Sequence, residues 1–324
     1  MLKIVYPICC GVDVHKKFIV ATIASTDNSN ITTYKTRKFT TYTNDLLNFK
    51  KWLSDNNCSV VCMESTGKYW IPVFNILEDS CDITIANPKY IKAIPGKKTD
   101  KKDSLWIADL HKHGLVKGSF IPPRDIRELR DLMRYRTKLV NIRSSEKNRI
   151  QNSLTVSNIM ISNIVSDSFG KSASAIIRYA MNNPDKTDVD YTKFLHKSMI
   201  HKADEINDSM QGIISREQAS KMAVCFNHLD YVENCISQLD LAISLIAKEF
   251  EPQIQLLATI PGITTKSAIS IISEIGVDMA VFPDSKHLCS WAGLTPQNNE
   301  SAGKKKSVRI SRAGVYIKPL LVQC

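Results

Sequence analysis

The stretch Ile8-Cys-Cys-Gly-Val-Asp-Val-His-Lys-Lys-Phe-Ile-Val-Ala-Thr-Ile23 decides how the N-terminal part of this chain folds. Residues 8–14 and 18–23 are rich in β-branched and aromatic side chains, and a short polar segment separates them, which predicts two strands joined by a turn. Asp13 interrupts the first apolar run. Burying a carboxylate in such a run is costly unless it has a partner such as a cation. Asp13 is therefore the first candidate metal ligand.

The segments that follow alternate between strand and helix patterns. Strands are predicted at 31–41, 60–63 and 83–86, and helices at 43–53, 69–77 and 103–111. Three strands followed by helix, strand, helix, strand and helix is the order of the RNase-H-like fold. We therefore expect an α/β domain of RNase-H/RuvC-like type over residues 1–121, ending before Pro122-Pro123.

Three further acids lie at the ends of these predicted elements. Glu64 ends one strand, and Asp100 and Asp103 lie three residues apart at a helix start, so they share a face. Carboxylates gathered at neighbouring ends repel one another, and divalent cations remove that repulsion. Oxygen ligands suit Mg²⁺ or Mn²⁺, and two such ions about 4 Å apart can clamp a phosphodiester. Together with Asp13, these acids are predicted metal ligands and catalytic residues.

Positive charge is concentrated in two segments of a chain whose net charge is +11. Residues 89–149 carry 17 Lys and Arg against 7 Asp and Glu, and residues 301–324 carry 6 Lys and Arg and no acid. This distribution indicates a polyanionic partner, so we expect nucleic-acid binding. The candidate contacts are Lys97, Lys98, Lys101, Lys102, Arg127, Arg130, Arg134, Lys304, Lys305 and Arg309. His15, His111 and His113, near the acids, are expected to contact phosphate or lie on the surface rather than to bind metal.

Other features of the composition exclude several classes of protein. No apolar run reaches the roughly 18 residues that a membrane span needs, and the N-terminus lacks the features of a signal peptide. The nine cysteines are scattered without a CxxC pair, which argues against a disulfide framework and a zinc site. We therefore expect a cytoplasmic, nucleoid-associated protein with reduced cysteines and no membrane partner.

A regular apolar repeat marks the middle region, residues 122–251. Between Met222 and Phe250 apolar residues recur at alternating steps of three and four over four heptads. This seam predicts a coiled coil or a long antiparallel helical pair, and through it we expect a homo-oligomer, a dimer or tetramer. Residues 155–215 show only weak periodicity.

The C-terminal region, residues 252–324, has a mainly helical pattern. Leu257-Ala-Thr-Ile-Pro-Gly-Ile263 followed by an apolar helix is typical of a helix–hairpin–helix element. The Pro-Gly turn of such an element presents backbone N–H groups to a phosphate. We therefore expect the C-terminal domain to contact nucleic acid as well.

Eight short motifs occur in a fixed order along most of the chain. They are Gly11-Val-Asp-Val-His-Lys16, Glu64-Ser-Thr-Gly-Lys-Tyr69, Asn87-Pro88, Lys98-Thr-Asp-Lys-Lys-Asp103, Ile260-Pro-Gly-Ile263, Ser290-Trp-Ala-Gly-Leu-Thr-Pro296, Ser301-Ala-Gly-Lys304 and Ile310-Ser-Arg-Ala-Gly314. Together they resemble the DEDD transposases of bacterial insertion sequences, the insertion-sequence-110 group. The resemblance implies a transposase or recombinase that cleaves and transfers DNA strands, with the four acids as its metal ligands.

The resemblance also implies a second catalytic group. Ser301 matches the family's nucleophilic serine, which attacks a DNA phosphate and forms a transient phosphoserine link. Members act as multimers, and some use an element-encoded bridge RNA, so DNA, a guide RNA and further copies are the implied partners. Two features depart from the family. Ala302 replaces a usual glycine, and the chain ends at Cys324 where members continue, so the C-terminal transposase domain is expected to be truncated.

Two other functions stay open on the sequence. The same acids with water as the nucleophile would make a RuvC-like junction nuclease, which would not need Ser301. A truncated, non-catalytic protein that binds nucleic acid and regulates its full-length relative would show binding without strand transfer.

Overall fold

The computed structural model describes residues 2–64, 67–87, 91, 100–186, 189–296, 299–301, 303–307, 309–310 and 313–323. The chain divides into two compact units, Met1–Ile121 and Pro122–Cys324. Across the described ranges, every helix is too short or too polar to cross a membrane.

The first unit is built on a five-stranded sheet in the order β3-β2-β1-β4-β5. Strands β1 (Ile8–Val14), β2 (Phe18–Thr26) and β3 (Thr32–Thr40) are antiparallel neighbours, whereas β4 (Val60–Glu64) and β5 (Asp82–Ala86) continue the sheet in parallel with β1. Helices α1 (Thr43–Asp55), α2 (Trp70–Leu77) and α4 (Asp100–Lys112) follow β3, β4 and β5 along the chain. The predicted α/β class and RNase-H-like order of elements are confirmed.

Successive side chains along each strand point to opposite faces of the sheet. The two faces pack against different helices. Val12 and Val14 belong to a core cluster shared with α1 and α2. On the other face, α4 packs against β1 at Gly11, where a Cβ would lie 2.3 Å from both the backbone N of Ala108 and the backbone O of Ser104. Only a residue without a side chain allows this approach, so Gly11 sets how closely α4 packs on the sheet.

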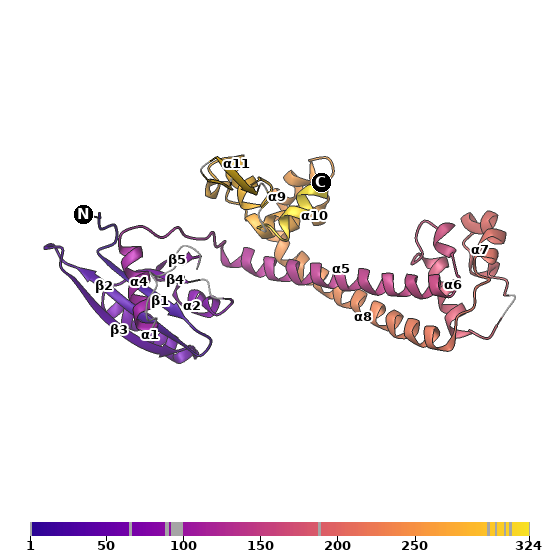
Figure 1. Cartoon of the computed structure of the whole chain (residues 1–324), viewed down its shortest axis with the longest axis horizontal. Helices are drawn as coiled ribbons and strands as arrows, with labels where there is room; N and C mark the ends of the chain where they lie inside the picture. The colour runs from indigo at the N-terminus through magenta and orange to yellow at the C-terminus, as the bar shows by residue number, and fades with distance from the viewer. Residues whose placement is uncertain are drawn as a thin grey trace. The chain divides into compact units, whose positions relative to one another are not determined.

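The second unit contains two long helices, α5 (Arg124–Val156) and α8 (Arg216–Ala247), which lie side by side (Figure 1). They run antiparallel, because Met133 near the start of α5 clusters with Ile243 near the end of α8, and Leu139 clusters with Val232 and Ile236. The seam residues from Met222 to Phe250 are buried or half-buried. The apolar seam that we expected to join copies of the chain is therefore covered by α5 of the same chain.

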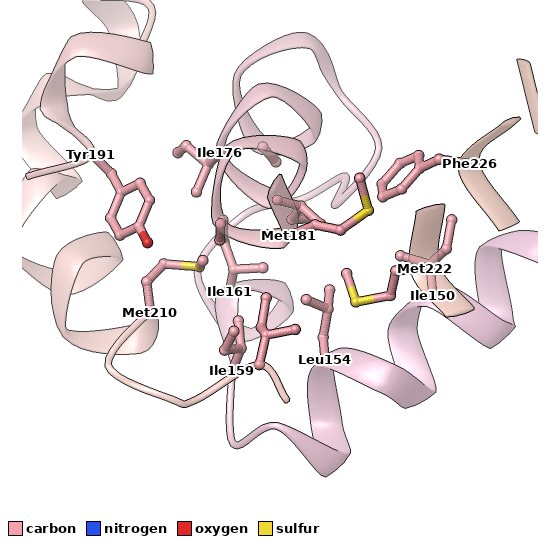
Figure 2. Packing of buried hydrophobic residues seen from close by; sticks show 14 of the residues in the cluster. Ile150, Leu154, Ile159, Ile161, Ile176, Met181, Tyr191, Met210, Met222 and Phe226 are labelled. Carbon is pink, nitrogen blue, oxygen red and sulfur yellow. The ribbon is translucent and has the colours of Figure 1, made fainter. Parts of the chain in front are cut away.

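A small helical domain lies at one end of this pair. Its elements are η1 (Ile161–Asn163), α6 (Lys171–Asn182), η2 (Thr192–Phe194), η3 (Lys197–Lys202) and α7 (Ala203–Ser209). Their apolar side chains meet Ile150 and Leu154 of α5 and Met222 and Phe226 of α8 in one cluster (Figure 2). Because most of these elements are short, their apolar residues follow no long period in the sequence.

The C-terminal elements pack at the other end of the pair. They are η4 (Lys248–Phe250), α9 (Glu251–Ala258), α10 (Thr265–Ile275), η5 (Met279–Val281), α11 (Ser285–Trp291), β6 (Asn299–Ser301), β7 (Lys304–Ser307) and α12 (Ile317–Gln323). Ile126 and Leu129 of α5 form a cluster with Ala268 and Ile272 of α10. Helices α9 and α10 flank the Pro-Gly turn, where Gly262 has a φ of 92°. The described part of this region is mainly helical, as expected.

Candidate active site

The parallel strands β1 and β4 place two of the predicted acids next to each other. Their register pairs Val12 with Met63, so Asp13 and Glu64 are the next residues on adjacent strands. Alternation puts Asp13 on the same face as Gly11, the face covered by α4, and it is buried. Because parallel strands end at the same edge of a sheet, both acids lie at that edge.

Helix α4 brings the other two acids to the same place. It begins at Asp100, and Asp103 follows one turn later. Burial raises the pKa of Asp13, and the negative charges of Asp103 and Asp100 raise it further, against the opposing effect of His15. These carboxylates are therefore close enough to repel one another, which is the situation that a divalent cation relieves.

His15 lies between two of these acids. Its Nε2 is 3.1 Å from Asp13 Oδ2 and 3.4 Å from Asp100 Oδ1. Ligand atoms of the three residues all lie within 4.8 Å of one another. Carboxylate oxygens and an imidazole nitrogen are a donor set that divalent cations such as Mn²⁺ accept, so the residues fit a metal ion. The sequence predicts His15 in the turn after the first strand, with a phosphate or surface contact, whereas the structure brings its Nε2 to the acids.

The other two histidines lie away from the acids' ligand atoms. His111 is buried with its ring stacked on Tyr6, the ring centroids being 4.7 Å apart. Neither ring nitrogen has a hydrogen-bond partner within the described part of the chain. The expectation that His111 contacts phosphate or lies on the surface is therefore wrong, because its side chain is buried against Tyr6. His113 Nδ1 lies 3.1 Å from the carbonyl oxygen of Lys3.

Ser301 lies at the tip of a hairpin in the second unit. It is the last residue of β6 and pairs with Lys304 of β7. Gly303 between them has a φ of 73°, in the left-handed region that a tight hairpin turn requires. Glu300 pairs with Lys305, so the backbone of the predicted nucleophile runs beside two of the predicted phosphate contacts.

Two of the predicted phosphate contacts on α5 are engaged inside the second unit. Arg130 donates to the carbonyl oxygens of Ser273 and Glu274, at 2.9 and 2.7 Å, and burial lowers its pKa to about 10. Arg134 donates twice to the buried carboxylate of Glu274, at 2.7 Å each. These bonds attach the start of α5 to the end of α10. No local pattern could reveal Glu274 as the partner, because it is 140 residues away.

The remaining predicted contacts are distributed over both units. Lys101 and Lys102 are exposed on the first turn of α4, next to the acids, and Arg309 is exposed in the C-terminal region. Arg127 donates to the carbonyl oxygen of Pro122 at 3.0 Å. Lys97 and Lys98 lie outside the described residues, as do the side chains of Ser301, Lys304 and Lys305.

Comparisons with known proteins show what this chain is similar to. The chain is similar to the solved structures of a Fowlpox virus resolvase with its substrate Holliday junction DNA (16% identity, TM-score 0.27, covering 33% of this chain and 99% of that one) and of Thermus thermophilus RuvC with a Holliday junction substrate (10% identity, TM-score 0.26, covering 35% and 99%). A comparison with curated protein sequences finds no match.

Two family models match separate parts of the sequence. Residues 10–159 match a transposase model of the IS110 DEDD type, and residues 254–324 match a model described as transposase of the IS116/IS110/IS902 family. The first match contains the four predicted metal ligands and the second contains Ser301. Because models of one family match both parts, this chain belongs to the IS110 family of insertion-sequence transposases.

Proposed function

We propose that this transposase cleaves and transfers the DNA strands of its insertion sequence at a metal site formed by Asp13, Glu64, Asp100 and Asp103. One observation carries the proposal. Acids from β1 and α4 converge at one edge of the sheet, where Asp13 is buried and its pKa is raised by burial and by the charges of its neighbours. Such a cluster stores repulsion that Mg²⁺ or Mn²⁺ would remove.

The chain's own residues have separable tasks in this proposal. The carboxylates hold and orient the cation, which when bound would stabilise the charge on a phosphodiester under attack. Lys101 and Lys102, exposed on the first turn of α4, supply positive charge beside the acids and attract the DNA backbone. Asp13 and Glu64 lie near the ends of paired strands, so the sheet register fixes the positions of their backbones.

Ser301 is the nucleophile that we propose for the covalent step. Its hydroxyl oxygen would bond to a DNA phosphorus and lose its proton, while the bond from that phosphorus to one sugar oxygen breaks. Two features support this role: the hairpin tip that β6 and β7 form, and the run Lys304-Lys-Lys-Ser307 in β7. Positive charge next to the attacked phosphate would stabilise the transition state.

The partners we propose are DNA, a guide RNA and further copies of the chain. Because α5 covers the apolar seam, copies would meet through other surfaces. On α8, Val224, Tyr231 and Leu245 are exposed at separations of 7 and 14 residues, and they are the first residues to test by substitution.

Strand transfer on a DNA substrate in Mg²⁺ tests the function directly. Asp13→Asn and Glu64→Gln should abolish strand transfer and leave salt-sensitive DNA binding intact, because binding depends on Lys and Arg. Asp79→Asn, an exposed acid paired with Lys50, is the matched control and should retain activity. Unchanged strand transfer by Asp13→Asn would refute the metal site.

A second experiment separates the alternative functions. Ser301→Ala should prevent both strand transfer and the covalent protein–DNA adduct, whereas the exposed Ser285→Ala should prevent neither. Cleavage that persists in Ser301→Ala without an adduct would instead identify a nuclease that uses water. DNA binding by the wild-type chain without any cleavage in Mg²⁺ or Mn²⁺ would identify a non-catalytic regulator.

A further inference from the structure

We infer that His15 is itself a metal ligand, binding through Nε2 beside Asp13 and Asp100. This inference rests on the proposed metal-dependent function and deepens it, because it adds a nitrogen donor to a set of carboxylates. Its basis is the position of Nε2, 3.1 Å from Asp13 Oδ2 and 3.4 Å from Asp100 Oδ1.

The separations between these atoms match those around a six-coordinate ion. An octahedral ion with bonds of about 2.1 Å has adjacent ligand atoms about 3.0 Å apart. The Nε2–oxygen distances of 3.1 and 3.4 Å are close to that separation, and the ligand atoms of all three residues lie within 4.8 Å of one another. An ion bound to Asp13 and Asp100 would thus have the Nε2 atom within coordinating reach.

The orientation of the ring is set by its surroundings. The backbone N–H of His15 donates to the carbonyl oxygen of Phe18 at 2.9 Å, which closes the tight turn between β1 and β2. The imidazole ring packs against the ring of Phe18, with centroids 4.6 Å apart. His15 directly follows β1, and its Nε2 lies 3.1 Å from the carboxylate oxygen Oδ2 of Asp13. The donor atom is therefore already directed at the acids.

Metal coordination constrains which ring nitrogen of His15 can carry a proton. In the structure Nε2 lies 3.1 Å from Asp13 Oδ2, at hydrogen-bond distance. A coordinating Nε2 must offer its lone pair, so the neutral ring carries its single proton on Nδ1 instead. The His15 side chain is 38% exposed, so solvent reaches the ring.

A nitrogen ligand changes which ion the site prefers. Imidazole donors favour the later divalent metals, whereas Mg²⁺ prefers an all-oxygen set. His15→Gln should therefore weaken Mn²⁺ binding about tenfold or more and weaken Mg²⁺ binding much less. His113→Gln, in the same unit but bonded to Lys3, is the matched control and should change neither affinity.

Pulsed electron paramagnetic resonance of Mn²⁺ bound to the full chain tests the inference without relying on activity. The spectrum should show modulation from one directly bound ¹⁴N nucleus. Labelling the chain with ¹⁵N-histidine should replace that signal with the ¹⁵N pattern, and His15→Gln should remove it. The isotope experiment uses the wild-type chain, so it holds even where the variant fails to fold.

Failure of the carboxylate metal site and failure of the His15 inference would give different results in the Mn²⁺ experiments. Mn²⁺ that binds, is lost in Asp13→Asn and shows no nitrogen modulation would overturn the role of His15 and leave the carboxylate site standing. A nitrogen signal that persists in folded His15→Gln would also overturn it. Absence of any bound Mn²⁺ would overturn the metal site and the inference together.

Discussion

Replacing Gly11 by Ala tests how the acids are brought together. The Cβ of an alanine at this position would lie 2.3 Å from the backbone N of Ala108 and 2.3 Å from the backbone O of Ser104. Ordinary contacts between such atoms begin near about 3.5 Å. Both atoms belong to the backbone of α4, so no side-chain rotation relieves the clash. The helix must therefore move away from β1 by about 1 Å.

The cost follows from that displacement. Overpacking a close-packed core typically costs about 1–3 kcal/mol, and a clash with helix backbone belongs at the upper end, about 3 kcal/mol. The same shift moves Asp100 and Asp103 relative to Asp13. Metal ligands tolerate deviations of only about 0.2 Å. We expect Mn²⁺ affinity to fall more than tenfold, and strand transfer to fall about 100-fold for a 1 Å misplacement.

Urea unfolding followed by tryptophan fluorescence, in a chain that carries Trp291→Phe, measures the stability of the first unit, which contains Trp52, Trp70 and Trp106. Mn²⁺ titration of the same samples measures the site. Gly118→Ala is the matched control, because its Cβ would lie 3.4 Å from a side-chain atom, Thr84 Cγ2, rather than from backbone, and it should stay within about 0.5 kcal/mol of wild type. A Gly11→Ala chain that matches wild type in both urea midpoint and Mn²⁺ affinity would refute the proposed packing of α4 on β1.

Three further substitutions test individual buried groups. Burial lowers the pKa of His111, so the folded chain favours the neutral ring and loses stability as pH falls below about 6.5. His111→Phe should reduce the difference in urea midpoint between pH 7 and pH 5, and an unchanged difference would contradict this. Glu274→Gln should destabilise the second unit by about 2 kcal/mol, less than a fully buried ion pair because Arg134 is 40% exposed. Glu274→Gln should cost clearly less stability in an Arg134→Met background. Equal costs in the two backgrounds would show that Glu274 and Arg134 do not stabilise each other. Burial acts to raise the pKa of Glu146, but hydrogen bonds from His228 and other residues outweigh burial, so the pKa of Glu146 is lowered in the folded chain. The stability that ionised Glu146 provides is therefore lost as the pH falls through that lowered pKa. Glu146→Gln should therefore cost about 1 kcal/mol at pH 7 and have little effect at pH 3, as measured by hydrogen exchange in α5 and α8.

The fold of the first unit could be predicted from the sequence because its signals are local. Strand and helix periods, the acid inside the apolar run around Asp13, and the acids at the ends of the following elements all lie within a few residues of the feature they mark. Parallel strands share an edge, so the neighbourhood of Asp13 and Glu64 follows from the order of the strands alone. The heptad seam likewise predicted a long helix.

The tertiary structure decided which partners the side chains in these patterns contact. The seam could have been buried by another copy of the chain, and the structure covers it with α5 instead. Arg134 is a basic residue on an amphipathic helix, and only the fold brings Glu274 to it from 140 residues away. His111 and His15 look alike in the sequence, yet one stacks inside on Tyr6 and the other directs Nε2 at two carboxylates. Periodicity determines that a side chain is buried or exposed, whereas its partner depends on packing between distant segments.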